Sequence, residues 1–228
     1  LAEARRRREH KLDTDRKPHV LFVAEDVTLA HVGRMIALAT SLDAARYDVT
    51  LACGERYAAL VRKAGLRHVS IWSMSPSYFA EQLANGRAVH TRALLTRYVA
   101  DDLALLSRER PDLVVGDFRV SLGISAEVAK VPYAAVVNAY WSPASTLRFP
   151  VPEHPAVRAF GLRVASVLAT VVRPLTFKLY LRPFNALRRR YGLAPLTSLF
   201  EMYTHADWTL YPDVPELAPV HKLLPGHS

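Results

Sequence analysis

The stretch HVLFVA, residues 19–24, is a continuous apolar run containing β-branched side chains. Such a run is typical of a strand buried on both faces of a parallel sheet. Similar segments recur along the chain, and we expect further strands over residues 47–53, 68–71, 113–115, 133–137 and 208–211. Segments with helical spacing predict helices over residues 30–42, 56–63, 88–108, 123–129, 157–172 and 175–190. This alternation predicts an α/β fold, a doubly wound parallel sheet with helices on both faces.

The chain has 228 residues, half of them hydrophobic, which is enough to bury a sizeable core. Its formal charge is +9, and much of the excess lies in two basic blocks, residues 5–8 and 182–190. The first block belongs to a charged, poorly patterned segment, so we expect residues 1–17 to form a disordered basic tail. Neither block matches a recognised nucleic-acid-binding motif, and we expect no nucleic-acid partner.

The sequence also bears on location. No apolar run reaches the roughly 18 residues of a membrane-spanning helix, and the start of the chain lacks the pattern of a signal peptide. Cys53 is the single cysteine, so an intrachain disulfide is impossible, and a buried, inert thiol is expected. We expect a cytoplasmic protein. Residues 177–191 mix apolar, aromatic and basic side chains, which suits either a membrane surface or a helix packed on its own domain; the second interpretation is favoured.

Parallel sheets bind ligands beyond the carboxyl ends of their strands. The loop after the first strand holds His31, at the point where a helix is expected to begin. A histidine in this position could act as a general base. The loop after residues 113–115 supplies Asp117, which could cap the next helix or turn, or face His31 across the crevice. In the second arrangement the carboxylate would fix the histidine tautomer and stabilise the imidazolium form.

The loop after residues 133–137 contains Asn138, Tyr140, Trp141 and Ser142, and its aromatic side chains either line a pocket or close the core. Other dense polar spots, including Asp101 with Asp102, are interpreted as solvated. The sequence has no glycine-rich phosphate loop, no cluster with metal-ligand spacing and no G-x-S-x-G elbow. Kinase, dehydrogenase and hydrolase functions therefore find no support, and no metal site is expected.

Three segments in order carry a family resemblance: TLAHV at residues 28–32, PDLVVGDF at 111–118, and VPY with NAYWSP at 131–133 and 138–143. Together with YPDVPEL at 211–217, they resemble the N-terminal domain of family 1 UDP-glycosyltransferase-like enzymes. The resemblance implies a Rossmann-like sheet that forms the N-terminal half of a GT-B fold. Residues 18–228 are then an acceptor-binding domain, and the C-terminal donor domain is absent from this chain.

The resemblance implies an inverting transfer of a sugar to a hydroxyl, with His31 as base and Asp117 supporting it. The donor is a nucleotide sugar, expected to be a UDP-sugar, and no other cofactor is implied. Acceptor loops would include residues 73–85 and 140–152, where Tyr78, Phe79, Asn138, Tyr140 and Trp141 suit a small apolar or aromatic acceptor. Ser142 stands where some relatives have a threonine that touches the donor sugar. The chain departs from the motif at Ala30 and Arg34, which replace a glycine and a proline.

Two functions stay open. The first is the acceptor half of a hexosyltransferase-type enzyme, inactive alone and completed by a donor-domain partner chain; a bare apolar face near the C-terminal end would favour it. The second is a stand-alone small-molecule-binding or regulatory module, which a well-sealed surface and a retained ligand would favour. Peripheral membrane association is compatible with either.

Overall fold

The computed structural model describes residues 16–145, 155–214, 216, 218–220 and 223–228. Its centre is a six-stranded sheet in the order β3-β2-β1-β4-β5-β6, with every neighbouring pair parallel. The strands are β1 (His19–Ala24), β2 (Asp48–Cys53), β3 (Arg67–Ser70), β4 (Leu113–Asp117), β5 (Tyr133–Val136) and β6 (Trp208–Leu210). The predicted Rossmann-like α/β sheet is confirmed.

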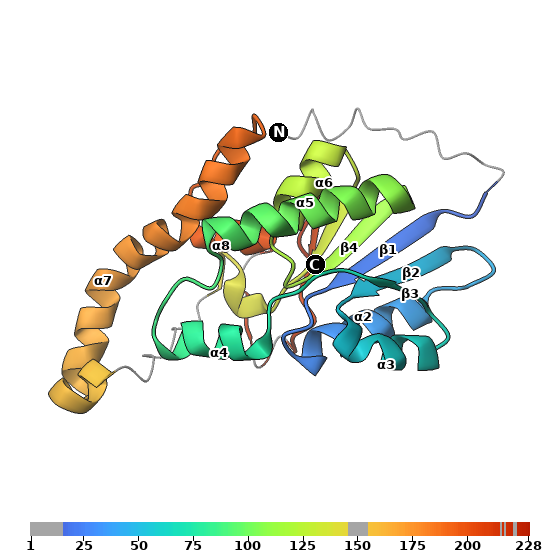
Figure 1. The fold of residues 1–228 in the computed structure, drawn as a ribbon. Coiled ribbons are helices and arrows are strands. Elements are labelled where there is room, and N and C mark those ends of the chain that lie inside the picture. The colour runs from blue at the N-terminus through green and yellow to red at the C-terminus, as the bar shows by residue number, and fades with distance from the viewer. Residues whose placement is uncertain (1–15, 146–154, 215, 217, 221–222) are drawn as a thin grey trace.

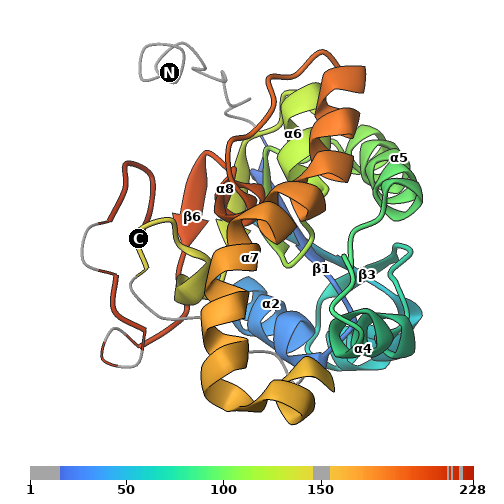
Figure 2. The same cartoon turned by 90° about the vertical axis from the view of Figure 1, so that its left-hand side faces the viewer.

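Helices cover both faces of the sheet, as Figure 1 shows. One face carries α2 (Leu29–Ser41) and α3 (Ala58–Lys63), and the other carries α5 (Arg92–Glu109) and α6 (Leu122–Ala129). The carboxyl ends of the strands point to the side where α4 (Pro76–Ala84), α7 (Pro155–Arg190) and α8 (Leu199–Thr204) lie (Figures 1 and 2). Two short 3-10 turns, η1 (Glu55–Tyr57) and η2 (Ala139–Trp141), complete the elements.

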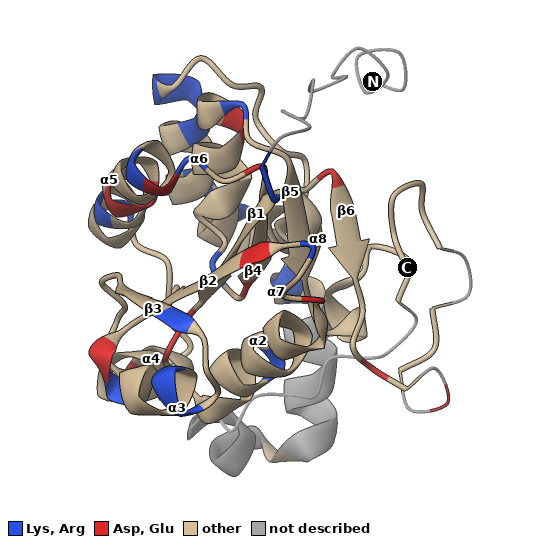
Figure 3. Cartoon of the chain, turned by 90° about the vertical axis from the view of Figure 1, so that its right-hand side faces the viewer, with Lys and Arg blue, Asp and Glu red and all other residues tan. Residues whose placement is uncertain are grey.

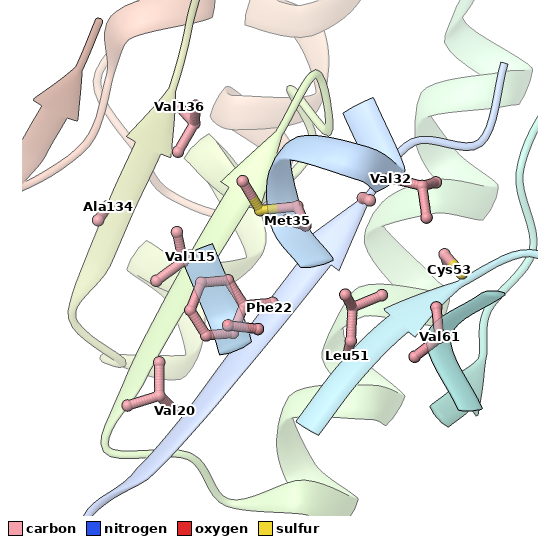
Figure 4. Packing of buried hydrophobic residues seen from close by; sticks show 12 residues of the cluster. Val20, Phe22, Val32, Met35, Leu51, Cys53, Val61, Val115, Ala134 and Val136 are labelled. Atoms are coloured by element: carbon pink, nitrogen blue, oxygen red, sulfur yellow. The ribbon is translucent and has the colours of Figure 1, made fainter. Parts of the chain in front are cut away.

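Successive side chains of β1 point to opposite faces of the sheet, and this explains why the core has two layers. Val20 and Phe22 point to the α2 side and pack with Met35 (Figure 4). Leu21 and Val23 belong to the cluster on the α5 side. All four are almost fully buried, which is why the run is apolar at every position. Cys53 is buried in the first layer, and burial raises the pKa of its thiol to about 12, in keeping with the expected inert cysteine.

The region between β3 and β4 differs from the prediction. The expected helix over residues 88–108 begins only at Arg92, because Thr91 caps it by accepting a hydrogen bond from the backbone N–H of Leu94 at 3.3 Å. A further helix, α4, occupies most of the segment that we expected to be a loop. Its signals are present in the sequence: Ser75 is the N-cap and Pro76 takes the first helical position.

Helix α7 also departs from the prediction of two helices separated by Arg173 and Pro174. It continues through Pro174, although a proline removes one hydrogen bond of the helix and its ring crowds the carbonyl four residues earlier. The interruption is instead at Gly161, whose φ of 76° is left-handed.

The aromatic and apolar residues of segment 177–191 mostly pack inward. Leu181 and Phe184 are buried against α5 and α6, so this part of α7 is held by its own domain. Val171, Leu175 and Leu179 are exposed, and membrane-surface association stays a prediction. Within the described residues, none of the helices combines the length and apolar character needed to cross a membrane.

Most of the predicted tail, residues 1–17, lies outside the described residues, as does the predicted acceptor loop beyond residue 145. Arg16, near the end of that tail, forms a two-pronged ion pair with Asp112, with N–O distances of 2.7 and 2.8 Å. Lys17 donates to the carbonyl of Ala44. On the face seen in Figure 3, α5 carries both basic and acidic residues, whereas the charged residues of α3 are basic.

Candidate active site

His31 and Asp117 meet at the carboxyl edge of the sheet. His31 lies in the first turn of α2, directly after β1, and Asp117 ends the neighbouring strand β4, where it pairs in register with Ala24. The distance from His31 Nδ1 to Asp117 Oδ1 is 2.9 Å. Asp117 is 1% exposed, whereas the His31 side chain is 15% exposed and lines a cavity. The pairing expected from the sequence is therefore geometrically in place.

A third residue, Arg34, joins this pair. It follows His31 by one helical turn, so both side chains point from the same face of α2. Its Nε and Nη2 donate to the two carboxylate oxygens of Asp117 at 2.8 and 2.9 Å, a bidentate fork. Its Nη1 donates to Asn138 Oδ1 at 2.5 Å, which ties the loop after β5 to the same cluster.

Arg34 also competes for the histidine. Its Nη2 lies 3.0 Å from His31 Nδ1, the nitrogen that also faces Asp117. Nδ1 can donate to Asp117 or accept from Arg34, but it cannot do both, because a neutral imidazole nitrogen is either protonated or a lone-pair acceptor. In the first tautomer Nε2 has a free lone pair and can act as a base, and in the second Nε2 carries the proton. The partner of Nδ1 therefore decides whether His31 is ready to accept a proton.

Aromatic rings form one wall beside His31. The Phe118 ring stacks on the imidazole with centroids 4.8 Å apart and an interplanar angle of 8°. Phe118 has a φ of 57°, a left-handed conformation that non-glycine residues seldom adopt and that often marks functional sites. Tyr203 of α8 stacks between Phe118, at 6.0 Å, and Trp141, at 4.1 Å.

This wall encloses a cavity of about 310 Å³. That volume is at the lower end of the range for small-molecule sites. Of the predicted acceptor residues, the cavity is lined by Phe79, Asn138, Tyr140 and Trp141. Tyr78 lies in a separate hollow, where its hydroxyl donates to the carbonyl of Val89 at 3.1 Å. Ser142 is buried, with its hydroxyl accepting from the Ala144 N–H.

A second charge cluster surrounds Arg119, which also lines the cavity. Arg119 is fully buried, donates from Nε to Asp102 at 2.9 Å and lies 3.6 Å from Glu25. Its guanidinium also sits over the Tyr98 ring at 3.9 Å. Burial raises the pKa of Glu25, although Arg119 opposes this shift. The interpretation of Asp102 as solvated is wrong: the residue is 0% exposed because Arg119 holds it inside.

Several residues of the site were not assigned a role from the sequence. Arg34 had an available signal, since it is three residues from His31 on a predicted helix. Phe118 and Arg119 directly follow Asp117, but nothing in the sequence indicates the left-handed conformation of Phe118. Tyr203 belongs to α8, a helix that was not predicted. Within the part of the chain that the structure describes, no group of three or more acidic, histidine or cysteine side chains could hold a metal ion.

Comparison with known proteins adds to this geometry. The chain matches no protein-family model. It is 44% identical over 213 residues to a PGL/p-HBAD biosynthesis glycosyltransferase of Mycobacterium tuberculosis, covering 93% of this chain and 50% of that protein. It is 46% identical over 214 residues to a PGL/p-HBAD biosynthesis rhamnosyltransferase of Mycobacterium bovis, covering 93% of this chain and 47% of that protein. Another relative is named an inactive PGL/p-HBAD biosynthesis glycosyltransferase of Mycobacterium bovis. It is 44% identical to this chain, and the match covers 58% of its length. The chain thus spans about half the length of the curated relatives it matches.

Solved structures agree on the fold. The glycotransferase of kitacinnamycin superposes with a TM-score of 0.57 at 21% identity, covering 86% of this chain and 46% of the other. The spinosyn forosaminyltransferase SpnP gives a TM-score of 0.53 at 19% identity, with 90% and 48% covered. In both comparisons nearly the whole of this chain matches about half of the larger protein.

Proposed function

Since this chain is a homologue of glycosyltransferases and has the architecture of half of a GT-B enzyme, we propose that it is the acceptor-binding half of such an enzyme. This agrees with the expectation from its sequence. It binds a small apolar or aromatic acceptor and presents the hydroxyl for inverting transfer from a nucleotide sugar. The observation that carries this proposal is the His31–Asp117 pair, 2.9 Å apart, at the wall of an aromatic cavity.

The chemistry assigned to each group follows from its position. With Nδ1–H donated to Asp117, His31 Nε2 removes the proton of the acceptor hydroxyl. The hydroxyl oxygen then forms the new bond to the anomeric carbon while the bond from that carbon to the diphosphate breaks. The nucleoside diphosphate leaves with the electron pair, and the proton stays on the imidazolium, which Asp117 stabilises.

The residues described here supply the acceptor side of this reaction. We propose that a donor half holds the nucleotide sugar, because positioning of both reactants provides much of the rate enhancement in group transfer. Apolar side chains near the C-terminal end are exposed, including Trp208 at 49%, Val214 at 53% and Leu223 at 52%. Exposed apolar side chains in this segment of the sequence suit a contact with further protein better than they suit a sealed, stand-alone binding module. The transferase half is therefore the function that the structure favours.

The decisive experiment joins these 228 residues to the half of the Mycobacterium tuberculosis relative that they do not match. Transfer is measured as release of nucleoside diphosphate and as product mass. Small phenols serve as acceptors; UDP-sugars and a nucleotide-activated rhamnose serve as donors. We expect negligible transfer by the 228 residues alone and measurable transfer by the fusion. His31→Ala in the fusion lowers kcat about 10²- to 10⁴-fold, the usual contribution of a general base.

His68→Ala is the matched control, because His68 lies on the edge strand β3 and does not line the cavity. Full activity of the His31→Ala fusion would refute the assigned base. Appreciable transfer by the isolated chain would refute the need for a donor half.

A further inference from the structure

One face of helix α7 leaves large apolar side chains in water. The helix lies on the outside of the domain (Figures 1 and 2) and packs inward through Leu181, Phe184 and Leu187. The opposite face carries an apolar stripe with exposed fractions of 43–72%, made of Val171, Val172, Leu175 and Leu179. These positions recur at helical spacing, so their side chains form one surface along the helix. A surface of this kind marks a place where another molecule binds.

Basic side chains continue the same face of the helix. In the sequence of α7 every charged residue is Lys or Arg. Lys178, Arg182 and Arg189 are exposed and follow the apolar stripe at helical spacing. Among the described residues, none of these three side chains forms an ion pair, whereas Arg188, on the inward face, pairs with Glu127 at 3.0 Å. The outward face therefore presents uncompensated positive charge next to exposed aliphatic side chains.

This combination of charge and apolar surface decides what covers the stripe. A second copy of the chain would bring two wholly basic helices together, and like charges repel. A nucleic acid would pair with the basic side chains and leave the aliphatic ones in water. The apolar segment near the C-terminal end, which we assign to the donor half, contains Asp213, Glu216 and Lys222 and so lacks this excess of positive charge. A membrane surface with anionic lipids satisfies both features, because its phosphates attract Lys and Arg while its acyl boundary accepts apolar side chains.

We propose that the outward face of α7 is a docking site for an anionic lipid surface. The helix lies in the plane of the membrane and the apolar stripe enters the headgroup region. Lys178, Arg182 and Arg189 reach the lipid phosphates on their long, flexible stems. Because the stripe is short and the charges are few, binding is reversible and sensitive to salt. This inference does not rest on the proposed acceptor-binding function, since it uses neither His31 nor Asp117.

Flotation of the 228-residue chain with lipid vesicles tests the proposal. We expect binding to phosphatidylcholine vesicles that contain about 30% phosphatidylglycerol, and binding at least about tenfold weaker to pure phosphatidylcholine. Binding to the anionic vesicles should weaken as salt rises from about 50 to about 300 mM. Combined substitution of Lys178→Gln, Arg182→Gln and Arg189→Gln should weaken it about a hundredfold, because each basic side chain near the surface contributes roughly fivefold.

The apolar stripe is tested separately. Leu175→Ser with Leu179→Ser should weaken binding to the anionic vesicles about tenfold, because less apolar surface enters the membrane. Leu60→Ser with Arg62→Gln is the matched control, since both residues are exposed on α3, away from α7 (Figure 1). Cys53 is buried, so an environment-sensitive thiol label modifies a cysteine added at the surface. Labelled Leu175→Cys should shift its emission to the blue with anionic vesicles, and labelled Leu60→Cys should not.

Several results would overturn the proposal. Absence of binding to anionic vesicles at low salt is the most direct. Binding that survives both sets of substitutions, or unchanged emission from labelled Leu175→Cys, means that another surface docks. A dimer in light scattering that Leu175→Ser with Leu179→Ser dissociates assigns the stripe to a second copy of the chain. Each of these results leaves the acceptor-binding function standing, because that function is tested through His31 in the fusion.

Discussion

Asp117 and Arg119 are separated by one residue, yet they belong to two charge clusters of opposite character. The cavity cluster contains His31, Arg34 and Asp117, with His31 and Arg34 partly exposed and able to exchange partners. The buried cluster joins Arg119 to Asp102 and Glu25, and all three side chains are 0% exposed. Phe118, in its left-handed conformation, turns the chain from one cluster to the other.

The difference lies in what each environment permits. In the cavity cluster, solvent and ligands reach the side chains, so a lost interaction can be replaced and proton positions can change. In the buried cluster no water replaces a lost partner, so each charge depends on the others. We infer that the buried cluster fixes the ends of β1 and β4 against the middle of α5, and that the cavity cluster carries the chemistry on this support.

The largest effect should come from breaking the buried cluster. Asp102→Asn leaves the Arg119 charge poorly compensated and should lower the free energy of unfolding by about 3–5 kcal/mol. Denaturant unfolding measures this loss. Asp101→Asn is the control on the same helix. Among the described residues, the ion-pair partner of Asp101 is Arg97 at 3.9 Å, so the substitution should change stability by less than about 0.5 kcal/mol. Equal effects of the two substitutions would remove the distinction between the clusters.

A pH titration tests the influence of the buried cluster on His90, which burial and, secondarily, the Arg119 charge keep neutral. Its pKa is about 4 in the folded chain against an ordinary value of 6.5. The unfolded chain therefore binds the proton first, and the contribution of His90 to stability is lost as pH falls from 6.5 towards 4. Relative to His90→Phe, the unmodified chain should lose about 1.4 kcal/mol per pH unit in this window.

The measurement is urea unfolding of both proteins at pH 7, 5.5 and 4.5. A stability difference between them that does not change with pH would show that His90 is not held neutral by its surroundings.

Much of the fold could be predicted from the sequence because buried parallel strands are apolar at every position. The run at residues 19–24 and the other apolar segments predicted the strands of the sheet, and the strand order places the loops after β1 and β4 side by side. His31 and Asp117 could thus be paired from position and family resemblance. Their contact, however, needed coordinates, since an aspartate after a strand can equally cap a helix.

The rest depended on contacts between residues distant in sequence. Asp102 was interpreted as solvated because it has an acidic neighbour on a helix, and its burial comes from Arg119, 17 residues away. Helix α8 is six residues long, too short for periodicity to identify, so Tyr203 was missed. Pro174 was read as a helix break, although packing of α7 further along the helix keeps it continuous.

The smallest effect should come from the cavity cluster, and it tests whether Arg34 controls the histidine tautomer. Arg34→Met removes the guanidinium that lies 3.0 Å from His31 Nδ1 and keeps most of the side-chain length. Asp117 is then the remaining partner of Nδ1, so the ratio of Nδ1–H to Nε2–H tautomer should rise about threefold to tenfold, the effect of one hydrogen bond. Long-range ¹H–¹⁵N spectra of the neutral imidazole report this ratio directly. Arg46→Met is the control, because Arg46 rests on the Tyr47 ring away from the cavity. An unchanged ratio in Arg34→Met would mean that Asp117 alone sets the tautomer, and that the cavity cluster is as fixed as the buried one.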